Sequence, residues 1–156
     1  MRFKPKKHFE QELEKVFEDG EVIVAENEER RDLFVIQEGR VAVFKKIGKK
    51  EVRLATMEKG DFFGEMSLLE SEPRSATVRA VGRTKVLAIQ PGGFLLKIRR
   101  DPTFAFEIMQ RLSGRVRAMN EKLAAALESA PSKGAHAARI ITETEYMPKG
   151  KGEGEG

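Results

Sequence analysis

The sequence of 156 residues lacks the residue types on which several classes of protein depend. It has no cysteine, which excludes disulfides, thiolate metal sites and cysteine nucleophiles. Its two histidines, His8 and His136, are far apart, and neither lies in a metal-ligand pattern or in a pairing of nucleophile and base. We therefore expect no enzymatic activity, no catalytic residues, no metal and no cofactor.

Long apolar runs are missing as well. No segment approaches the roughly 18 apolar residues that span a bilayer, and the basic start of the chain does not resemble a secretory signal. We expect no membrane segment and a cytoplasmic location, which the absence of cysteine also fits.

Charge, by contrast, is abundant. The chain has 29 Lys and Arg against 25 Asp and Glu, a formal net charge of +4. A basic balance favours an anionic partner, which leaves nucleic acid, a phosphate ligand and an acidic protein face as alternatives. Because basic and acidic residues are interleaved, most of them are expected to lie on a solvated surface.

The apolar pattern changes twice along the chain. Phe9, Leu13, Val16 and Phe17 recur at helical spacing and predict an amphipathic helix over about 6–18. After it come short runs of β-branched and aromatic residues separated by turn signals at 26–28, 38–40, 47–49, 59–61 and 81–83. The runs are 22–24, 33–36, 41–44, 52–54, 77–81 and 85–89. This spacing predicts an all-β sandwich or barrel.

The rest of the chain is predicted to be helical. Pro91 begins a short segment, and Asp101 with Pro102 is typical of an N-cap followed by a first helical residue. Steps of three and four then give one apolar stripe from 103 to about 128. The expected organisation is a helical segment over 1–18, a β-barrel over 19–100, a long helix over 101–129 and a weakly ordered tail over 130–156.

Residues 60–78 combine features that suit an anion bearing hydroxyl groups. Gly64 permits close backbone approach, and the helical turn expected directly after it would present free N–H groups. Arg74 supplies a guanidinium suited to phosphate, followed by the small residues Ser75 and Ala76. Glu65 is an acceptor for hydroxyl groups.

Segments 63–69 and 73–77 resemble the phosphate-binding cassette of the cyclic-nucleotide-binding domain family. The resemblance covers roughly residues 16–125 and implies a mainly β jelly-roll barrel, α+β overall, with an N-terminal helix, a short cassette helix and a long C-terminal helix. It implies cAMP or cGMP as the ligand.

The resemblance also implies roles for individual residues. Gly64 would offer its backbone to ribose and phosphate, and Glu65 would accept a hydrogen bond from the ribose 2′-hydroxyl. Arg74 would pair with the phosphate, and Ser75 and Ala76 would donate their N–H groups. The rest of the expected ligand-binding set is Phe63, Met66 and Ser67 in the cassette, and Val43 and Leu54, with Ala55, along the base pocket.

Some of these roles have simpler alternatives. Arg74 could form a surface ion pair with Glu70 or Glu72, and Val43 and Leu54 could belong to the core. Where many family members have a glycine in the first strand turn, this chain has Asn27, which tolerates left-handed geometry. The positions that bind adenine in one branch of the family fall near Leu123 and Ala124, which cannot hydrogen-bond a base, so the preferred base stays open.

The long helix carries the stripe Leu112, Val116, Met119 and Leu123, which suits a coiled-coil seam. We expect a homodimer through this stripe, with packing on the protein's own barrel as the alternative. Too few residues follow for a winged helix, so direct sequence-specific DNA binding is not expected.

The predicted function is a cyclic-nucleotide sensor that signals to an unidentified protein through its C-terminal helix. A hinge over about 94–100 would reposition that helix when the ligand binds. The alternatives are a nucleotide-independent interaction module and, least favoured, a phosphodiesterase.

Overall fold

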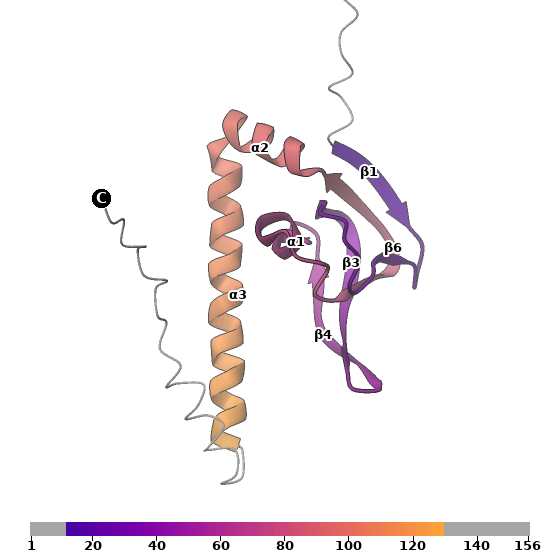
Figure 1. The fold of residues 1–156 in the computed structure, drawn as a ribbon, viewed down its shortest axis with the longest axis vertical. Helices are drawn as coiled ribbons and strands as arrows, with labels where there is room; N and C mark the ends of the chain where they lie inside the picture. Colours follow the sequence, from indigo (N-terminus) through magenta and orange to yellow (C-terminus); the bar gives the residue numbers. More distant parts are fainter. Residues whose placement is uncertain (1–11, 130–156) are drawn as a thin grey trace, which may run out of the picture. The chain divides into compact units, whose positions relative to one another are not determined.

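The computed structural model describes residues 12–129 (Figure 1). The predicted tail over 130–156 and residues 1–11 of the predicted N-terminal segment lie outside this range. The chain divides into two compact units, one up to Glu107 and one from Ile108 onward. The first contains every strand of the described residues and the candidate site.

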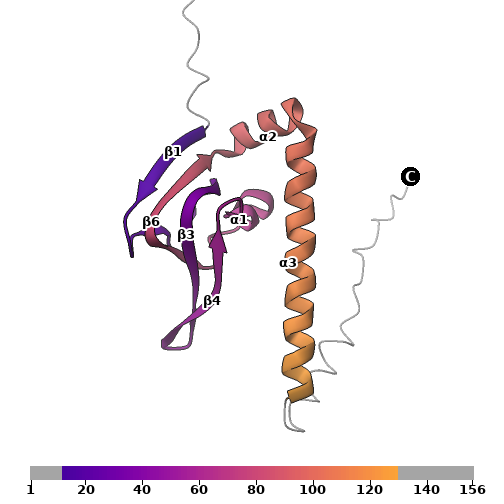
Figure 2. The same ribbon diagram turned by 180° about the vertical axis from the view of Figure 1, so that it is seen from behind.

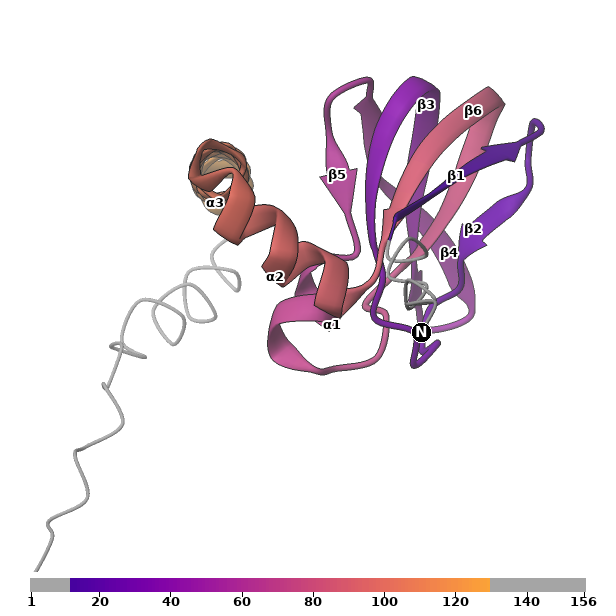
Figure 3. The ribbon, with the colours of Figure 1, turned by 90° about the horizontal axis from the view of Figure 1, so that it is seen from above.

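The first unit is built on one antiparallel sheet. In chain order the elements are β1 (Glu12–Phe17), β2 (Val22–Val24), β3 (Leu33–Ile47), β4 (Lys50–Glu58), β5 (Phe62–Phe63), α1 (Glu65–Glu70), β6 (Thr77–Ile89), α2 (Pro91–Arg100) and α3 (Pro102–Ser129). The strand order is β1-β6-β3-β4, as Figure 2 shows from behind, and β2 pairs with β6. β5 pairs with β3 and lies beside it in Figure 3. The mainly β, jelly-roll prediction is confirmed, although the hydrogen-bonded sheet formed by the described strands does not close into a full barrel.

The predicted N-terminal helix is wrong where the structure can be compared with it. Residues 12–17 form β1, which pairs with β6 from Glu12 opposite Ile89 to Phe17 opposite Thr84. Leu13 and Val16 are exposed, whereas Phe17 packs against the core. Backbone pairing with the edge of β6 outweighs the helical spacing of the apolar residues in this segment. The periodicity of the sequence does not reveal that pairing.

Two predicted turns are also wrong, because they lie inside continuous strands. Residues 38–40 belong to β3 and 81–83 to β6, and the β3–β6 register shifts between Ile36 and Arg40. Gly39 has a φ of 82°, and a β-carbon there would lie 2.5 Å from the Arg83 carbonyl oxygen. The glycine at this position therefore allows a β-bulge. The turn predicted at 47–49 is confirmed as the hairpin between β3 and β4.

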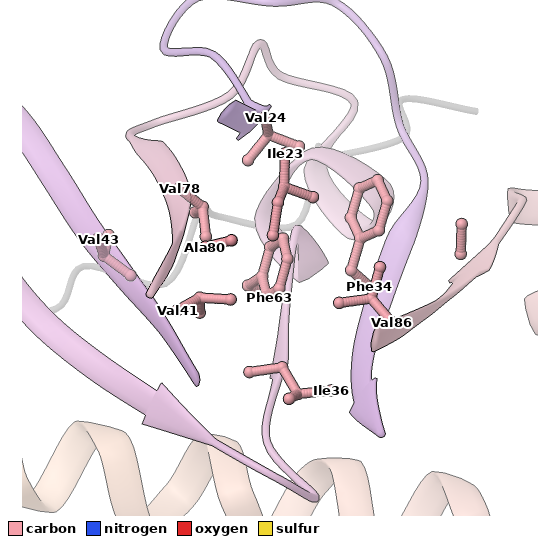
Figure 4. Packing of buried hydrophobic residues seen from close by; sticks show 11 residues of the cluster. Ile23, Val24, Phe34, Ile36, Val41, Val43, Phe63, Val78, Ala80 and Val86 are labelled. Carbon is pink, nitrogen blue, oxygen red and sulfur yellow. The ribbon is translucent and has the colours of Figure 1, made fainter. Parts of the chain in front are cut away.

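The core is formed by side chains from strands that are far apart in the sequence. Figure 4 shows side chains of β2, β3, β5 and β6 meeting in one cluster. Phe34 of β3 and Phe63 of β5 stack within it, with ring centroids 5.1 Å apart. The cluster fixes β5, and so positions Gly64 and the helix that follows.

The helical predictions after residue 90 are confirmed. α2 begins at Pro91, and Asp101 interrupts the helix before α3, where its Oδ1 accepts a hydrogen bond from the Thr103 N–H at 3.1 Å. Phe94 of α2 and Phe104 of α3 meet edge to face, with ring centroids 5.9 Å apart. None of the helices in the described residues has the length and apolar composition that crossing a membrane requires.

Candidate functional site

A left-handed glycine precedes the short helix α1. Gly64 has a φ of 88°, and its carbonyl oxygen accepts the hydrogen bond of the Leu68 N–H at 3.2 Å. A side chain at this φ would be strained, which explains the glycine. The helical turn predicted after Gly64 is confirmed as α1.

Arg74 is a buried cation whose hydrogen-bonding capacity is mostly unused. It is 3% exposed, and its Nη1 donates to the Gly64 carbonyl oxygen at 3.1 Å. Its guanidinium carbon lies 5.6 Å from the centroid of the Phe34 ring. Nε and Nη2 are buried without a hydrogen-bond partner among residues 12–129. Buried donors are normally paired, so these two atoms mark a position suited to an anion.

The electrostatics of Arg74 agree with that interpretation. Burial is the main reason that the pKa of Arg74 is lowered, and the neighbouring carboxylates of Asp32 and Glu28 act in the opposite direction. Such a cation is stabilised when an anion replaces the water it has lost. A surface ion pair with Glu70 or Glu72 is not what the structure shows, because both glutamates are exposed and Arg74 is not.

The backbone of Arg74 is held from the turn after β2. The Asn27 N–H donates to the Arg74 carbonyl oxygen, and the Arg74 N–H donates to the Glu28 carbonyl oxygen, each at 2.8 Å. Asn27 has a φ of 69°, the left-handed geometry expected from asparagine. We call residues 74–76 the ligand arm; these two bonds fix its first residue.

Sequence reasoning missed Arg31. Its Nε donates to the Ser67 carbonyl oxygen at 3.3 Å and its Nη2 to the Leu68 carbonyl oxygen at 3.2 Å. The Ser67 carbonyl also accepts the Ser71 N–H, so Arg31 adds a second donor there. A cation is favourable beside the last carbonyls of a helix. The contacts span 36 and 37 residues of sequence, so no local pattern announces them.

A second missed group contacts the middle residue of the ligand arm. The Lys45 ammonium donates to the Ser75 carbonyl oxygen at 2.6 Å and pairs with Glu26 at 2.9 Å. The hydrogen bond from Lys45 is the main reason that the pKa of Glu26 is lowered, and the Lys46 N–H lowers it further.

The remaining predicted cassette residues differ in exposure. Phe63 and the Ser67 side chain are buried, whereas Met66 is exposed and its sulfur accepts a hydrogen bond from the Ser75 hydroxyl at 3.6 Å. Glu65 is half-buried, and Ala76 packs against the core. The start of α1 and the ligand arm therefore face each other.

The two residues predicted to line a base pocket differ in the same way. Val43 is buried in the core, opposite Ala55 in the β3–β4 register. Leu54 is 48% exposed and lies where that register shifts. Val43 therefore fits the core alternative, and Leu54 presents an apolar surface to solvent.

The site combines groups that can bind an anion with the carboxylate of Glu65, which can accept hydrogen bonds. The guanidinium of Arg74, the left-handed Gly64 and the N-terminus of α1 suit a phosphate, and Glu65 begins the same helix. Within residues 12–129, no cluster of three or more His, Cys, Asp or Glu residues could hold a metal ion.

Comparison with known proteins agrees with this geometry. The family model described as "cyclic nucleotide-binding domain" matches residues 14–101. A putative potassium channel protein of Rhodopseudomonas palustris is 36% identical over 102 residues, which are 63% of this chain and 24% of the channel protein. The cyclic AMP receptor protein of Thermus thermophilus is 34% identical over 104 residues, or 66% of this chain and 48% of the receptor.

A solved structure shows the same fold. The crystal structure of the Thermus thermophilus catabolite activator protein matches with a TM-score of 0.66 and 31% identity, covering 73% of this chain and 54% of that one. The chain thus spans about half or less of the length of these relatives. Since the family model covers more than half of the chain and includes the whole of α1 and the ligand arm, this chain belongs to the cyclic nucleotide-binding domain family.

Proposed function

We propose that this chain is a regulatory protein that binds cAMP or cGMP between α1 and the ligand arm. The observation that carries the proposal is the buried guanidinium of Arg74, with two donor atoms unpaired beside Gly64. A cyclic phosphate supplies oxygen acceptors for those atoms, and a ribose hydroxyl supplies a donor for Glu65. The name of the Thermus relative, a cyclic AMP receptor protein, favours cAMP.

Isothermal titration calorimetry with cAMP and cGMP tests the proposal. Wild type is expected to bind at least one nucleotide, and Arg74→Ala is expected to lose about 2–5 kcal/mol of binding free energy, because a buried phosphate would be left unpaired. Arg83→Ala is the matched control: it removes the same charge from an exposed residue in β6. Equal affinities of wild type and Arg74→Ala would contradict the proposal, and so would the failure of both nucleotides to bind.

Signalling through the helices is the second part of the proposal. Asp101, with φ −137° and ψ 87°, separates α2 from α3. A ligand-dependent change in this region would reposition α3, to the extent that the nucleotide binds the two conformations with different affinity. The contact between Phe94 and Phe104 places the first turn of α3 against α2, so the hinge expected over 94–100 extends to Asp101 in this proposal.

We also propose that α3 forms a homodimer through Leu112, Val116, Met119 and Leu123. Val116, Met119 and Leu123 are 58%, 67% and 42% exposed, an apolar surface that a second copy of the helix would cover. Sedimentation of the double variant Val116→Glu and Leu123→Glu is expected to show a monomer where wild type is a dimer. Ala125→Glu adds a charge at an exposed position off the stripe and should leave the dimer intact. A wild-type monomer at all concentrations would contradict this assignment.

A further inference from the structure

We propose that Lys45 is a positioning residue of the nucleotide site, which fixes the Ser75 carbonyl and thereby aims the Ala76 N–H at the anionic group of the ligand. The inference rests on the proposed function and assigns a role in it to a residue outside the cassette.

Lys45 is held from two sides. Its Nζ donates to the Ser75 carbonyl oxygen at 2.6 Å and lies 2.9 Å from Oε1 of Glu26. The other carboxylate oxygen of Glu26 accepts the Lys46 N–H at 3.1 Å. The Glu26 N–H in turn donates to Oγ1 of Thr77 at 3.0 Å. Lys45 therefore connects β3, the turn after β2 and the ligand arm in one hydrogen-bonded group.

The effect on Ala76 follows from the geometry of the peptide bond. The described residues contain no cis peptide, so the carbonyl of Ser75 and the N–H of Ala76 point in opposite directions. Anchoring the carbonyl to Lys45 turns the N–H away from Lys45. Within residues 12–129, no backbone carbonyl accepts a hydrogen bond from this N–H. It is therefore available to an acceptor from outside the chain.

The neighbouring contacts place the ligand arm, which carries this N–H, beside the start of α1. The Ser75 hydroxyl reaches the Met66 sulfur of α1, and Arg74 reaches the Gly64 carbonyl just before α1. With the Arg74 backbone bonded to Asn27 and Glu28, the ligand arm is fixed at its first residue by the backbone and at its second by Lys45. An arm fixed in advance loses less conformational entropy when a ligand binds.

Lys46 offers a matched control. It follows Lys45 in β3 and is exposed, and within residues 12–129 its side chain forms no hydrogen bond or ion pair. Replacing either lysine by methionine removes the same charge from nearly the same place. Only the Lys45 variant removes the contact with Ser75, so the pair separates positioning from the general attraction of a basic surface.

The experiment is calorimetry with whichever of cAMP and cGMP binds wild type more tightly. Lys45→Met is expected to weaken binding about tenfold, the effect of losing one charge-assisted hydrogen bond. Lys46→Met is expected to stay within about twofold, because an exposed charge is screened by salt. Lys45→Arg should restore most of the affinity, since it keeps a donor for Ser75 and a cation for Glu26.

A second measurement excludes a merely structural effect. In amide spectra of the ligand-free protein, recorded at a temperature where both variants are fully folded, Lys45→Met should shift the Ala76 resonance while Lys46→Met leaves it in place. If Arg74→Ala abolishes binding but the two methionine variants bind alike, the positioning role is overturned and the proposed function stands. If wild type binds neither nucleotide, the proposed function fails and this inference fails with it.

Discussion

A β-carbon on Gly64 would lie 2.6 Å from Nη1 of Arg74, and the same distance from the Asp32 carbonyl oxygen. The backbone before α1 and the guanidinium are therefore in direct contact, with no room for a methyl group between them. The contact also lies at a left-handed φ of 88°. The effect of the close contact and the effect of the left-handed backbone can be separated by mutation.

We expect Gly64→Ala to lower the unfolding free energy by more than about 2 kcal/mol and to abolish nucleotide binding, because left-handed strain and a steric clash add together. Gly48→Ala is the control. Gly48 is also left-handed, with a φ of 64°, but a β-carbon there would meet no other atom within 4 Å. It should cost about 1 kcal/mol of strain alone and leave binding unchanged. Urea denaturation and calorimetry check both variants; equal destabilisation would contradict the close contact.

Replacing Arg74 by methionine should uncouple stability from binding. Methionine fills a similar volume without bringing a buried charge that has two unpaired donor atoms. We expect the ligand-free Arg74→Met variant to unfold with an unchanged free energy or one higher by up to about 2 kcal/mol. Nucleotide should no longer raise its unfolding temperature. A variant that is much less stable than wild type would show that the contacts with Gly64 and Phe34 outweigh the cost of burying the charge.

Arg31 is expected to stabilise α1. Arg31→Ala removes the donor to the Leu68 carbonyl and one of two donors to the Ser67 carbonyl, which also accepts the Ser71 N–H. It should lower the unfolding free energy by about 1 kcal/mol. Nucleotide affinity should fall as well, because α1 carries Glu65. The preceding residue, Arg30, pairs with Asp32 and Glu28 and is largely exposed, so Arg30→Ala is the control and should change stability by less than about 0.5 kcal/mol. Chemical denaturation compares the unfolding free energies of the two variants. Equal effects of Arg31→Ala and Arg30→Ala would contradict the stabilisation of α1 by Arg31.

Glu26 should make the free energy of unfolding depend on pH in the acid range. Lys45 and the Lys46 N–H lower the pKa of this carboxyl from its ordinary value of 4.5 in the folded chain. A lowered folded pKa means that the contribution is complete above pH 4.5 and is lost as the pH falls through the lower folded value. The unfolding temperature of wild type should therefore exceed that of Glu26→Gln at neutral pH and approach it in acid. A difference that grows in acid would reverse the sign and refute the assignment.

The cassette can be predicted because its chemistry is local. Gly64, Arg74 and the helix between them lie within one short stretch, and their spacing alone indicates an anion site. The left-handed geometry of Asn27 also follows from its residue type. The ligand contacts of the whole predicted set stay predictions: those of Gly64 and Arg74, and those of Phe63, Glu65, Met66, Ser67, Ser75, Ala76, Val43 and Leu54.

The supporting residues could not be predicted, because they reach the site across the sequence. Arg31 is 36 residues from Ser67, and Lys45 is 30 residues from Ser75. In the sequence, both have the pattern of charged residues on an exposed surface. Their roles depend on which segments the sheet brings together, and no local pattern records that.

The strand errors have a related cause. A glycine with positive φ is the same signal in a turn and in a bulge, so Gly39 and Gly82 indicate strand ends in the sequence although the strands continue through them. At the other end of the sheet, β1 carries a helical pattern of apolar residues but pairs with β6. Tertiary pairing decides both cases.

The continuity of β6 has a consequence for how the site and α2 are joined. This strand of 13 residues begins at Thr77, directly after the ligand arm, and ends at Ile89, one residue before the N-cap of α2. An extended chain of that length measures about 40 Å and cannot lengthen. A shift of the arm that carries Thr77 with it would therefore be passed along the strand toward α2, and Gly82, with a φ of 71°, is a point midway at which the strand can bend.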